Sequence, residues 1–198
     1  MGGRVGAEPE WPPADVIVGN PPFVGDRKMR RELGDNYVDA LRNLYEDRLP
    51  GGSDLVCYWF EKARAMIENG QVKRAGLLAT QGIRGGLNRT VLDRIKLSGN
   101  IFWAESDRDW ILDGAVVHVS MIAFDNGIET AFLLDGKQVA TINSDLSSKT
   151  DLTLAKALAE NARISFIGTQ KSGPFDLTET QAKKNVKDTR QPKSTTQQ

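Results

Sequence analysis

A short corner of the chain combines residue types that could recognise an amino group. It follows the apolar run 15–18 and consists of Asn20, Pro21, Pro22 and Phe23. Each proline fixes φ and removes a backbone N–H, so the corner is rigid and presents mainly hydrogen-bond acceptors, including the Asn20 side-chain oxygen. A rigid pair of acceptors followed by an aromatic ring suits a planar group that carries an amino function.

The element before this corner must hold it in place. Residues 15–18, Asp-Val-Ile-Val, form a short and mostly β-branched apolar run, which predicts a strand covered on both faces in the parallel sheet of an α/β domain. Open α/β sheets bind ligands at the carboxyl ends of their strands, and the corner leaves its strand at that end. The predicted strand therefore places the corner where a functional site is expected.

The following hundred residues alternate between helical and strand patterns. Ser53 is predicted to cap the helix 54–68, and Asn88 is predicted to cap a helix that ends near Gly99. This alternation predicts right-handed βαβ units on a mostly parallel sheet. The further helices are expected around 27–33 and 36–46, and the further strands at 75–80, 101–105 and 115–124, with the last in the sheet interior.

The pattern changes after Asp125. Residues 130–142 predict a hairpin, because Asp135-Gly136 fits a two-residue type I′ turn, and a helix at 151–161 and a strand at 164–168 are expected to follow. The predicted organisation has four parts. They are an irregular lead-in at 1–13, a partial catalytic domain at 14–126, the start of a smaller α+β module at 127–181, and a disordered basic tail at 182–198.

Composition excludes several classes of protein. The 198 residues suffice for one domain with part of a second. The 26 Lys and Arg residues balance the 26 Asp and Glu residues, so the net charge does not indicate any class of binding partner. A single cysteine, Cys57, and a single histidine, His118, rule out a disulfide framework and a Cys/His zinc site. Both are predicted to be packed in the core. Without a signal peptide or a membrane-length apolar run, we expect a soluble cytoplasmic protein with no metal.

The corner and its surroundings resemble a known enzyme family. Asn-Pro-Pro-Phe after a hydrophobic strand resembles motif IV of the S-adenosylmethionine-dependent amino methyltransferases, especially those that methylate adenine N6 in DNA. The stretches 83–95, 101–121 and 173–176 are similar to the MmeI-like type IIL restriction–modification proteins. The resemblance covers roughly residues 14–180 and implies the C-terminal half of a class I methyltransferase sheet, mostly parallel with one antiparallel strand.

The resemblance implies a direct methyl transfer to a flipped adenine in double-stranded DNA. By analogy, the Asn20 amide oxygen and the Pro21 carbonyl accept hydrogen bonds from the adenine N6 amino group, which directs the nitrogen lone pair toward the methyl group. Phe23 would stack on the base, a contact worth about 1–3 kcal/mol in proteins that bind single strands. No general base is required.

The sequence departs from the family upstream of the corner. Family members of this motif order carry a glycine-rich S-adenosylmethionine loop and an acidic ribose-binding residue before motif IV, but residues 1–19 show no strand–GxG–helix pattern. We therefore expect a fragment or split gene product, weakly active or inactive alone, whose main cofactor motif comes from a separate chain with the N-terminal half. Among the residues present, Asp54 is a candidate for the edge of the cofactor pocket, or alternatively a partner of a helix dipole.

Several basic residues are candidates for contacts to DNA phosphates. A cluster of four precedes the second helical stretch, and a fifth begins an Arg-Gly-Gly loop; they are Arg27, Lys28, Arg30, Arg31 and Arg84. A solvated helix face and an ordinary flexible loop are the alternatives at these positions. Two other functions also stay open, an amino methyltransferase acting on protein glutamine or RNA, and a non-enzymatic remnant that binds DNA or a partner.

Overall fold

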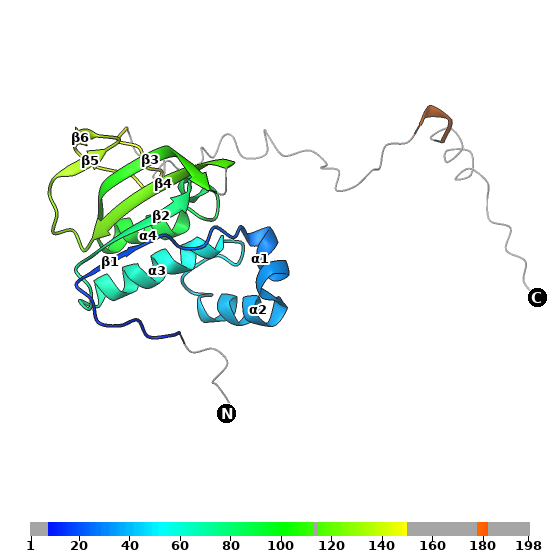
Figure 1. The fold of residues 1–198 in the computed structure, drawn as a ribbon, viewed down its shortest axis with the longest axis horizontal. Coiled ribbons are helices and arrows are strands. Elements are labelled where there is room, and N and C mark those ends of the chain that lie inside the picture. Colours follow the sequence, from blue (N-terminus) through cyan, green and yellow to red (C-terminus); the bar gives the residue numbers. More distant parts are fainter. Residues whose placement is uncertain (1–7, 113–114, 150–177, 182–198) are drawn as a thin grey trace, which may run out of the picture. The chain divides into compact units, whose positions relative to one another are not determined.

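The computed structural model describes residues 8–112, 115–149 and 178–181 (Figure 1). The chain divides into two units, Met1–Ala155 and Lys156–Gln198. In the second unit the described residues form one capped turn, in which Thr178 and Gln181 exchange hydrogen bonds between side chain and backbone. The predicted helix 151–161, the strand 164–168 and the tail 182–198 lie outside the described residues.

A six-stranded sheet organises the first unit. Its strand order is β1-β2-β4-β3-β5-β6, with β1 at one edge of the described sheet. β1 and β2 are parallel, β4 runs antiparallel between β2 and β3, β5 is parallel to β3, and β6 is antiparallel to β5. The strands are β1 (Val16–Gly19), β2 (Arg74–Thr80), β3 (Asn100–Leu112), β4 (Ala115–Asp125), β5 (Phe132–Leu134) and β6 (Lys137–Val139).

The domain has the α/β class that the alternating pattern predicts, and the described strand pairings are mixed, two of them parallel and three antiparallel. Up to residue 125, β4 is the one strand that runs against the others, and it lies inside the sheet as expected. The helices that alternate with the strands are α1 (Asp26–Leu33), α2 (Asp35–Leu44), α3 (Leu55–Glu68), a 3₁₀ turn (Gln81–Arg84) and α4 (Thr90–Ser98).

The helices α3 and α4 cover one face of the sheet. α3 contacts α4 and β2, and α4 contacts β3 (Figure 1). Along β2 the side chains of Ala75, Leu77 and Ala79 are buried, and those between them are only half-buried. Phe60 of α3 stacks on Phe124 of β4 with ring centroids 5.9 Å apart. One side of the sheet therefore forms the core.

A buried ion network joins the two covering helices. The Glu61 carboxylate of α3 is fully buried and accepts hydrogen bonds from Arg64 of the same helix and from Arg94 of α4, at distances of 2.8–3.1 Å. Arg64 also contacts Glu68 and Ser98. Because the buried charges of Glu61 and Arg64 are paired, and the half-buried Arg94 reaches Glu61 from α4, the network fixes α4 against α3.

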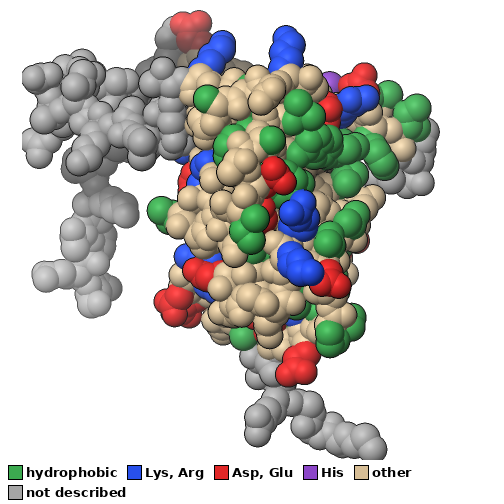
Figure 2. All heavy atoms as spheres, turned by 90° about the vertical axis from the view of Figure 1, so that its left-hand side faces the viewer, with side chains coloured by type: hydrophobic (Ala, Val, Ile, Leu, Met, Phe, Trp, Pro, Cys, Tyr) green, Lys and Arg blue, Asp and Glu red, His purple; other side chains and the backbone are tan. Residues whose placement is uncertain are grey.

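The opposite face of the sheet is open. A row of directly paired residues crosses it from β1 to β5, and the described residues leave every member half-buried or exposed; the row is Val18, Gly76, Ala123, Trp103 and Leu133. Figure 2 shows hydrophobic side chains gathered on the surface beside the single histidine of the chain. This open face is largely apolar.

Two burial predictions are wrong, and the first of them fails because of this open face. The run 15–18 was expected to be covered on both faces, but Val16 is 47% and Val18 is 82% exposed, whereas the alternate residue Ile17 packs against the core. His118 was expected in the core, but it lies on the part of the β3–β4 hairpin that extends past the end of β2, where it is exposed with Nδ1 2.8 Å from Asp107 Oδ1. Continuous apolar and β-branched runs do not indicate which face of a strand other elements will cover.

The hairpin after residue 125 continues the same sheet. Its turn has φ of 50° at Asp135 and 73° at Gly136, as expected for type I′. The Asp135 carboxylate accepts hydrogen bonds from the backbone N–H and the hydroxyl of Ser106, at 2.6 and 2.8 Å. The hairpin is thereby fixed to the irregular part of β3, and the boundary at 127 stays a prediction.

Close packing of the turn after α4 predicts a large effect of one methyl group. A Cβ at Gly99 would lie 2.0 Å from the backbone oxygen of Asp125, which a side-chain movement cannot relieve. We expect Gly99→Ala to lower the free energy of unfolding by about 2–3 kcal/mol in urea denaturation. Gly76→Ala is the matched control, because its Cβ would meet nothing within 4 Å. Equal stabilities of the two variants would contradict this packing.

Candidate active site

The predicted corner lies at the carboxyl end of β1. Parallel pairing aligns Gly19 with Leu77 of β2, so the segments that follow these two strands leave the sheet at the same end. Asn20 is exposed, and its side chain makes no hydrogen bond within the described part of the chain. Pro21 is buried, Phe23 is half-buried, and the Pro22 carbonyl accepts a hydrogen bond from Val24 N–H at 3.1 Å. The Asn20 amide is thus free to bind a ligand.

The exit of the corner is anchored to the start of α3. Leu55 N–H donates to the Val24 carbonyl at 3.0 Å, and Asp26 N–H donates to Asp54 Oδ1 at 2.7 Å. Asp54 also pairs with Asn88, which accepts from Asp54 N–H and donates from Nδ2 to Asp54 Oδ2, both at 2.8 Å. Three segments that are distant in sequence therefore meet behind the corner.

The structure corrects two predicted helix caps. Asp54, and not Ser53, is the N-cap residue of α3, and Ser53 is buried with an Oγ that has no partner among the described residues. Asn88 was expected to cap the following helix, but Arg89 occupies the N-cap of α4 and the Asn88 side chain binds Asp54 instead. Asn88 is a site residue that sequence reasoning missed, because its only signal was a local capping pattern.

The five predicted DNA-contacting cations differ in how they are engaged. Arg30 bridges Asp35 and Asp39 at 2.9 and 2.7 Å, which joins α1 to α2. Arg31 pairs with Glu32, and Arg84 donates to the Asp145 carbonyl at 3.1 Å. Arg27 and Lys28 are exposed, form no ion pair within the described residues, and line a shallow depression with Gly25, Gly52 and Asp54. Of the five, these two are the cations nearest the exit of the corner.

The depression beside the corner is about 420 Å³ in volume. Two carboxylates reach it, and both have partners within the chain. Asp26 pairs with Arg42, and both oxygens of Asp54 accept the hydrogen bonds described above. The Asp54 carboxylate therefore serves the link between the corner and α3.

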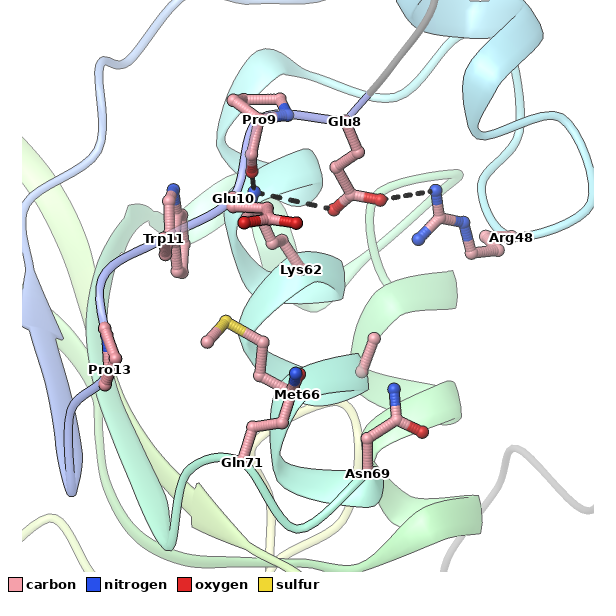
Figure 3. A pocket seen from close by; sticks show the side chains of 11 residues that line it. Glu8, Pro9, Glu10, Trp11, Pro13, Arg48, Lys62, Met66, Asn69 and Gln71 are labelled. Carbon is pink, nitrogen blue, oxygen red and sulfur yellow. Dashed lines mark hydrogen bonds and ion pairs between the residues drawn. The ribbon is translucent and has the colours of Figure 1, made fainter.

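A larger hollow of about 660 Å³ lies on the far part of α3 (Figure 3). Residues 8–13 cross α3 there, with Lys62 directed at the Pro9 carbonyl and Glu8 placed between Lys62 and Arg48. Trp11 stacks on Trp59 and also receives the Lys62 ammonium over its ring. Because these charges are paired with one another, we interpret the hollow as the place where the N-terminal segment is attached to α3.

The single cysteine lies close to the Asp54–Asn88 pair. Cys57 is fully buried, as predicted, and its Sγ is 3.5 Å from Asn88 Oδ1. Burial, followed by the nearby Asp54 charge, raises the pKa of the Cys57 thiol to about 12. The thiol is therefore protonated at neutral pH, and Cys57 is a packing residue and not a nucleophile.

The described residues contain no group of three or more His, Cys, Asp and Glu side chains arranged to hold a metal ion. None of the described helices has both the length and the apolar character needed to cross a membrane.

Comparisons with known proteins find a matching family model and a similar solved structure. The family model of the MmeI DNA-methyltransferase domain matches residues 9–135. Among solved structures, the chain resembles the type IIL restriction–modification enzyme MmeI in complex with DNA, with 25% sequence identity and a TM-score of 0.56. The match covers 69% of this chain and 20% of the MmeI chain, so the chain spans about a fifth of that enzyme. The comparison with curated proteins finds no match.

The buried thiol gives a direct test of the packing behind the corner. Because the pKa of Cys57 is raised from 9.0 to about 12, we expect the native chain to resist iodoacetamide from pH 7 to pH 9, whereas the urea-unfolded chain reacts. Mass spectrometry is unambiguous, since the chain has one cysteine. Rapid labelling of the native chain at pH 8 would show that the Asp54–Asn88–Cys57 region is open.

Proposed function

The chain belongs to the MmeI DNA-methyltransferase domain family, and from this premise we propose that it forms the target-base part of a site-specific adenine-N6 DNA methyltransferase of a restriction–modification system. The observation that carries the proposal is the exposed Asn20 amide at the carboxyl end of β1, held in a corner that is fixed at both ends. This is the edge at which α/β sheets bind their ligands.

The corner offers two acceptors to an adenine amino group. The Asn20 side-chain oxygen is exposed, and the Pro21 carbonyl accepts no hydrogen bond within the described residues, in contrast to the Pro22 carbonyl. Two acceptors that bind the two N6 protons direct the nitrogen lone pair out of the base plane, toward the incoming methyl group. Phe23 follows on the same rigid segment and supplies a ring for stacking on a flipped base.

The methyl donor implied by the family is S-adenosylmethionine, which supplies an electrophilic methyl group. The described residues do not form a site that fits this molecule. The predicted cofactor residue, Asp54, already accepts hydrogen bonds from Asp26 N–H and from Asn88, and the neighbouring Asp26 pairs with Arg42. We therefore assign the binding of the base, and not of the donor, to the described residues.

The open sheet face supports the proposal that another segment completes the site. The edge strand β1 exposes Val18 and continues into the apolar row across the sheet. Parallel sheets are normally covered on both faces. A cofactor-binding segment on a separate chain, with a strand for the β1 edge and apolar side chains for this face, would bring the donor to the Asn20 corner.

The positively charged residues near the corner support contact with DNA. Arg27 and Lys28 are exposed beside the depression at the corner exit, so we propose that these two contact phosphates of double-stranded DNA. Arg84 lies at the carboxyl end of β2, on the neighbouring loop, and remains a proposed contact. Arg30 and Arg31 are proposed with them, although their guanidinium groups already pair with carboxylates in the chain.

Recognition of the amino group can be tested on the 198-residue chain itself. In an NMR titration with adenosine, we expect shifts of the Asn20 side-chain amide and the Phe23 ring. Purine riboside, which lacks the amino group, should bind about tenfold more weakly, the effect of one or two lost hydrogen bonds. Asn20→Ala should remove this difference between the ligands. If wild type binds both nucleosides equally, the proposed recognition of the amino group is wrong.

The open face generates a second prediction. We expect Val18→Lys to leave the unfolding free energy of the chain within about 0.5 kcal/mol of wild type, because the side chain is 82% exposed. In the complete methyltransferase, the same variant should lose methyl transfer. Leu97→Lys is the matched control, because Leu97 is 86% exposed on α4, a helix of the opposite face. Equal activity of the two variants would contradict a covering segment at β1.

A further inference from the structure

We propose that Asp54 and Asn88 are a positioning pair that sets the geometry of the Asn20–Phe23 corner. The inference rests on the proposed function, because the corner is the base-binding site in that proposal. It assigns to the pair no contact with the base. The pair acts through the backbone that leaves the corner.

The first observation is how few residues separate the two anchors of the corner. Gly19 is fixed upstream by its pairing with Leu77. Val24 is fixed downstream by the hydrogen bond from Leu55 N–H to its carbonyl at 3.0 Å. Only residues 20–23 lie between these two points, and two of them are prolines with fixed φ. Displacement of the downstream anchor must therefore move Asn20 and Phe23.

The second observation is the direction of the Asp54 carboxylate. Asp54 is the N-cap residue of α3, yet its side chain makes no capping hydrogen bond to α3. Its Oδ1 instead accepts from Asp26 N–H at 2.7 Å, at the start of α1, where the N-cap residue Gly25 has no side chain of its own. The carboxylate thus connects the N-termini of α3 and α1, directly after the corner.

The third observation is that Asn88 determines this direction. The Asn88 side chain accepts from the backbone N–H of Asp54 and donates from Nδ2 to Asp54 Oδ2, each at 2.8 Å, so the Asn88 amide closes a hydrogen-bonded ring with the backbone and the carboxylate of Asp54, the one charged acceptor. The Cys57 thiol packs against the Asn88 amide oxygen at 3.5 Å. Asn88 ends the Gly-rich segment after β2, and the ring therefore ties that loop to the exit of the corner.

The hydrogen-bonded ring predicts that each of two single variants breaks it and that the double variant restores it. In Asp54→Asn, the side chains at positions 54 and 88 are both amides. If the new amide oxygen keeps the hydrogen bond from Asp26 N–H, its Nδ2 faces Asn88 Nδ2, and two donors meet with no acceptor between them. In Asn88→Asp, two carboxylates face each other. The double variant Asp54→Asn/Asn88→Asp restores one donor and one carboxylate in exchanged positions, and every hydrogen bond of the ring can form again.

The test is the adenosine titration of the chain, performed well below the unfolding temperature. We expect each single variant to weaken adenosine binding about tenfold, as loss of a charge-assisted hydrogen bond would. The double variant should return to within about twofold of wild type. Hydrogen exchange of the Asp26 amide should accelerate in the single variants and slow again in the double variant.

A stability control separates positioning from a general loss of structure. Arg94→Met breaks the ion pair with Glu61, which lies about two turns along α3 from Asp54, and Arg94 makes no contact with residues 20–24 among the described hydrogen bonds and ion pairs. It should lower the unfolding temperature without changing adenosine affinity. The inference is overturned if this variant weakens binding as much as Asp54→Asn does, or if the folded double variant does not recover binding. It is also overturned if the single variants bind like wild type.

The outcomes distinguish this inference from the proposed function. If wild type does not prefer adenosine to purine riboside, the proposed function fails first, and the positioning role falls with it. If wild type shows the preference and Asp54→Asn retains it, only the positioning role is wrong. Should a single variant not fold, the double variant alone remains decisive, because it must both fold and bind.

Discussion

Parallel pairing of β1 with β2 is the constraint on which the candidate site depends. Because Gly19 lies opposite Leu77, the corner that follows β1 and the loop that follows β2 leave the sheet at the same end. This allows Asp54 and Asn88, 34 residues apart in the chain, to form two hydrogen bonds. A slip of one residue would turn Ile17 away from the core and would move Asn20 relative to its anchors. The register of these four residue pairs thus determines where the side chains of the corner lie.

In the described part of the chain, helices cover only one face of this sheet. α3 and α4 cover the face that carries Ala75 and Phe124, and the Glu61–Arg64–Arg94 network holds the two helices together. The other face exposes Val18 and half-exposes Trp103. The described residues thus form a core on one face of the sheet, and the proposed second segment at β1 would cover the other.

Short-range sequence patterns predicted the helices, strands and turns better than they predicted which segments pack against them. The apolar first turns of α3, the β-branched run of β4 and the Asp135-Gly136 turn are short-range signals, and the structure contains all three. The resemblance to MmeI-like methyltransferases is confirmed by the family match. Burial of Val18 and His118 and the partner of Asn88 depend on which segments meet across the sheet, and one sequence does not contain that information. The catalytic role of Asn20 remains a prediction.

The identity of the methylated nucleoside tests the central claim most directly. DNA treated with the complete enzyme and S-adenosylmethionine can be digested to nucleosides and analysed by mass spectrometry. If the Asn20 corner binds an adenine amino group, the product is N6-methyldeoxyadenosine, and Asn20→Ala removes it while Leu97→Lys does not. Methylation of cytosine alone, or an unchanged yield of N6-methyldeoxyadenosine in Asn20→Ala, would contradict the account.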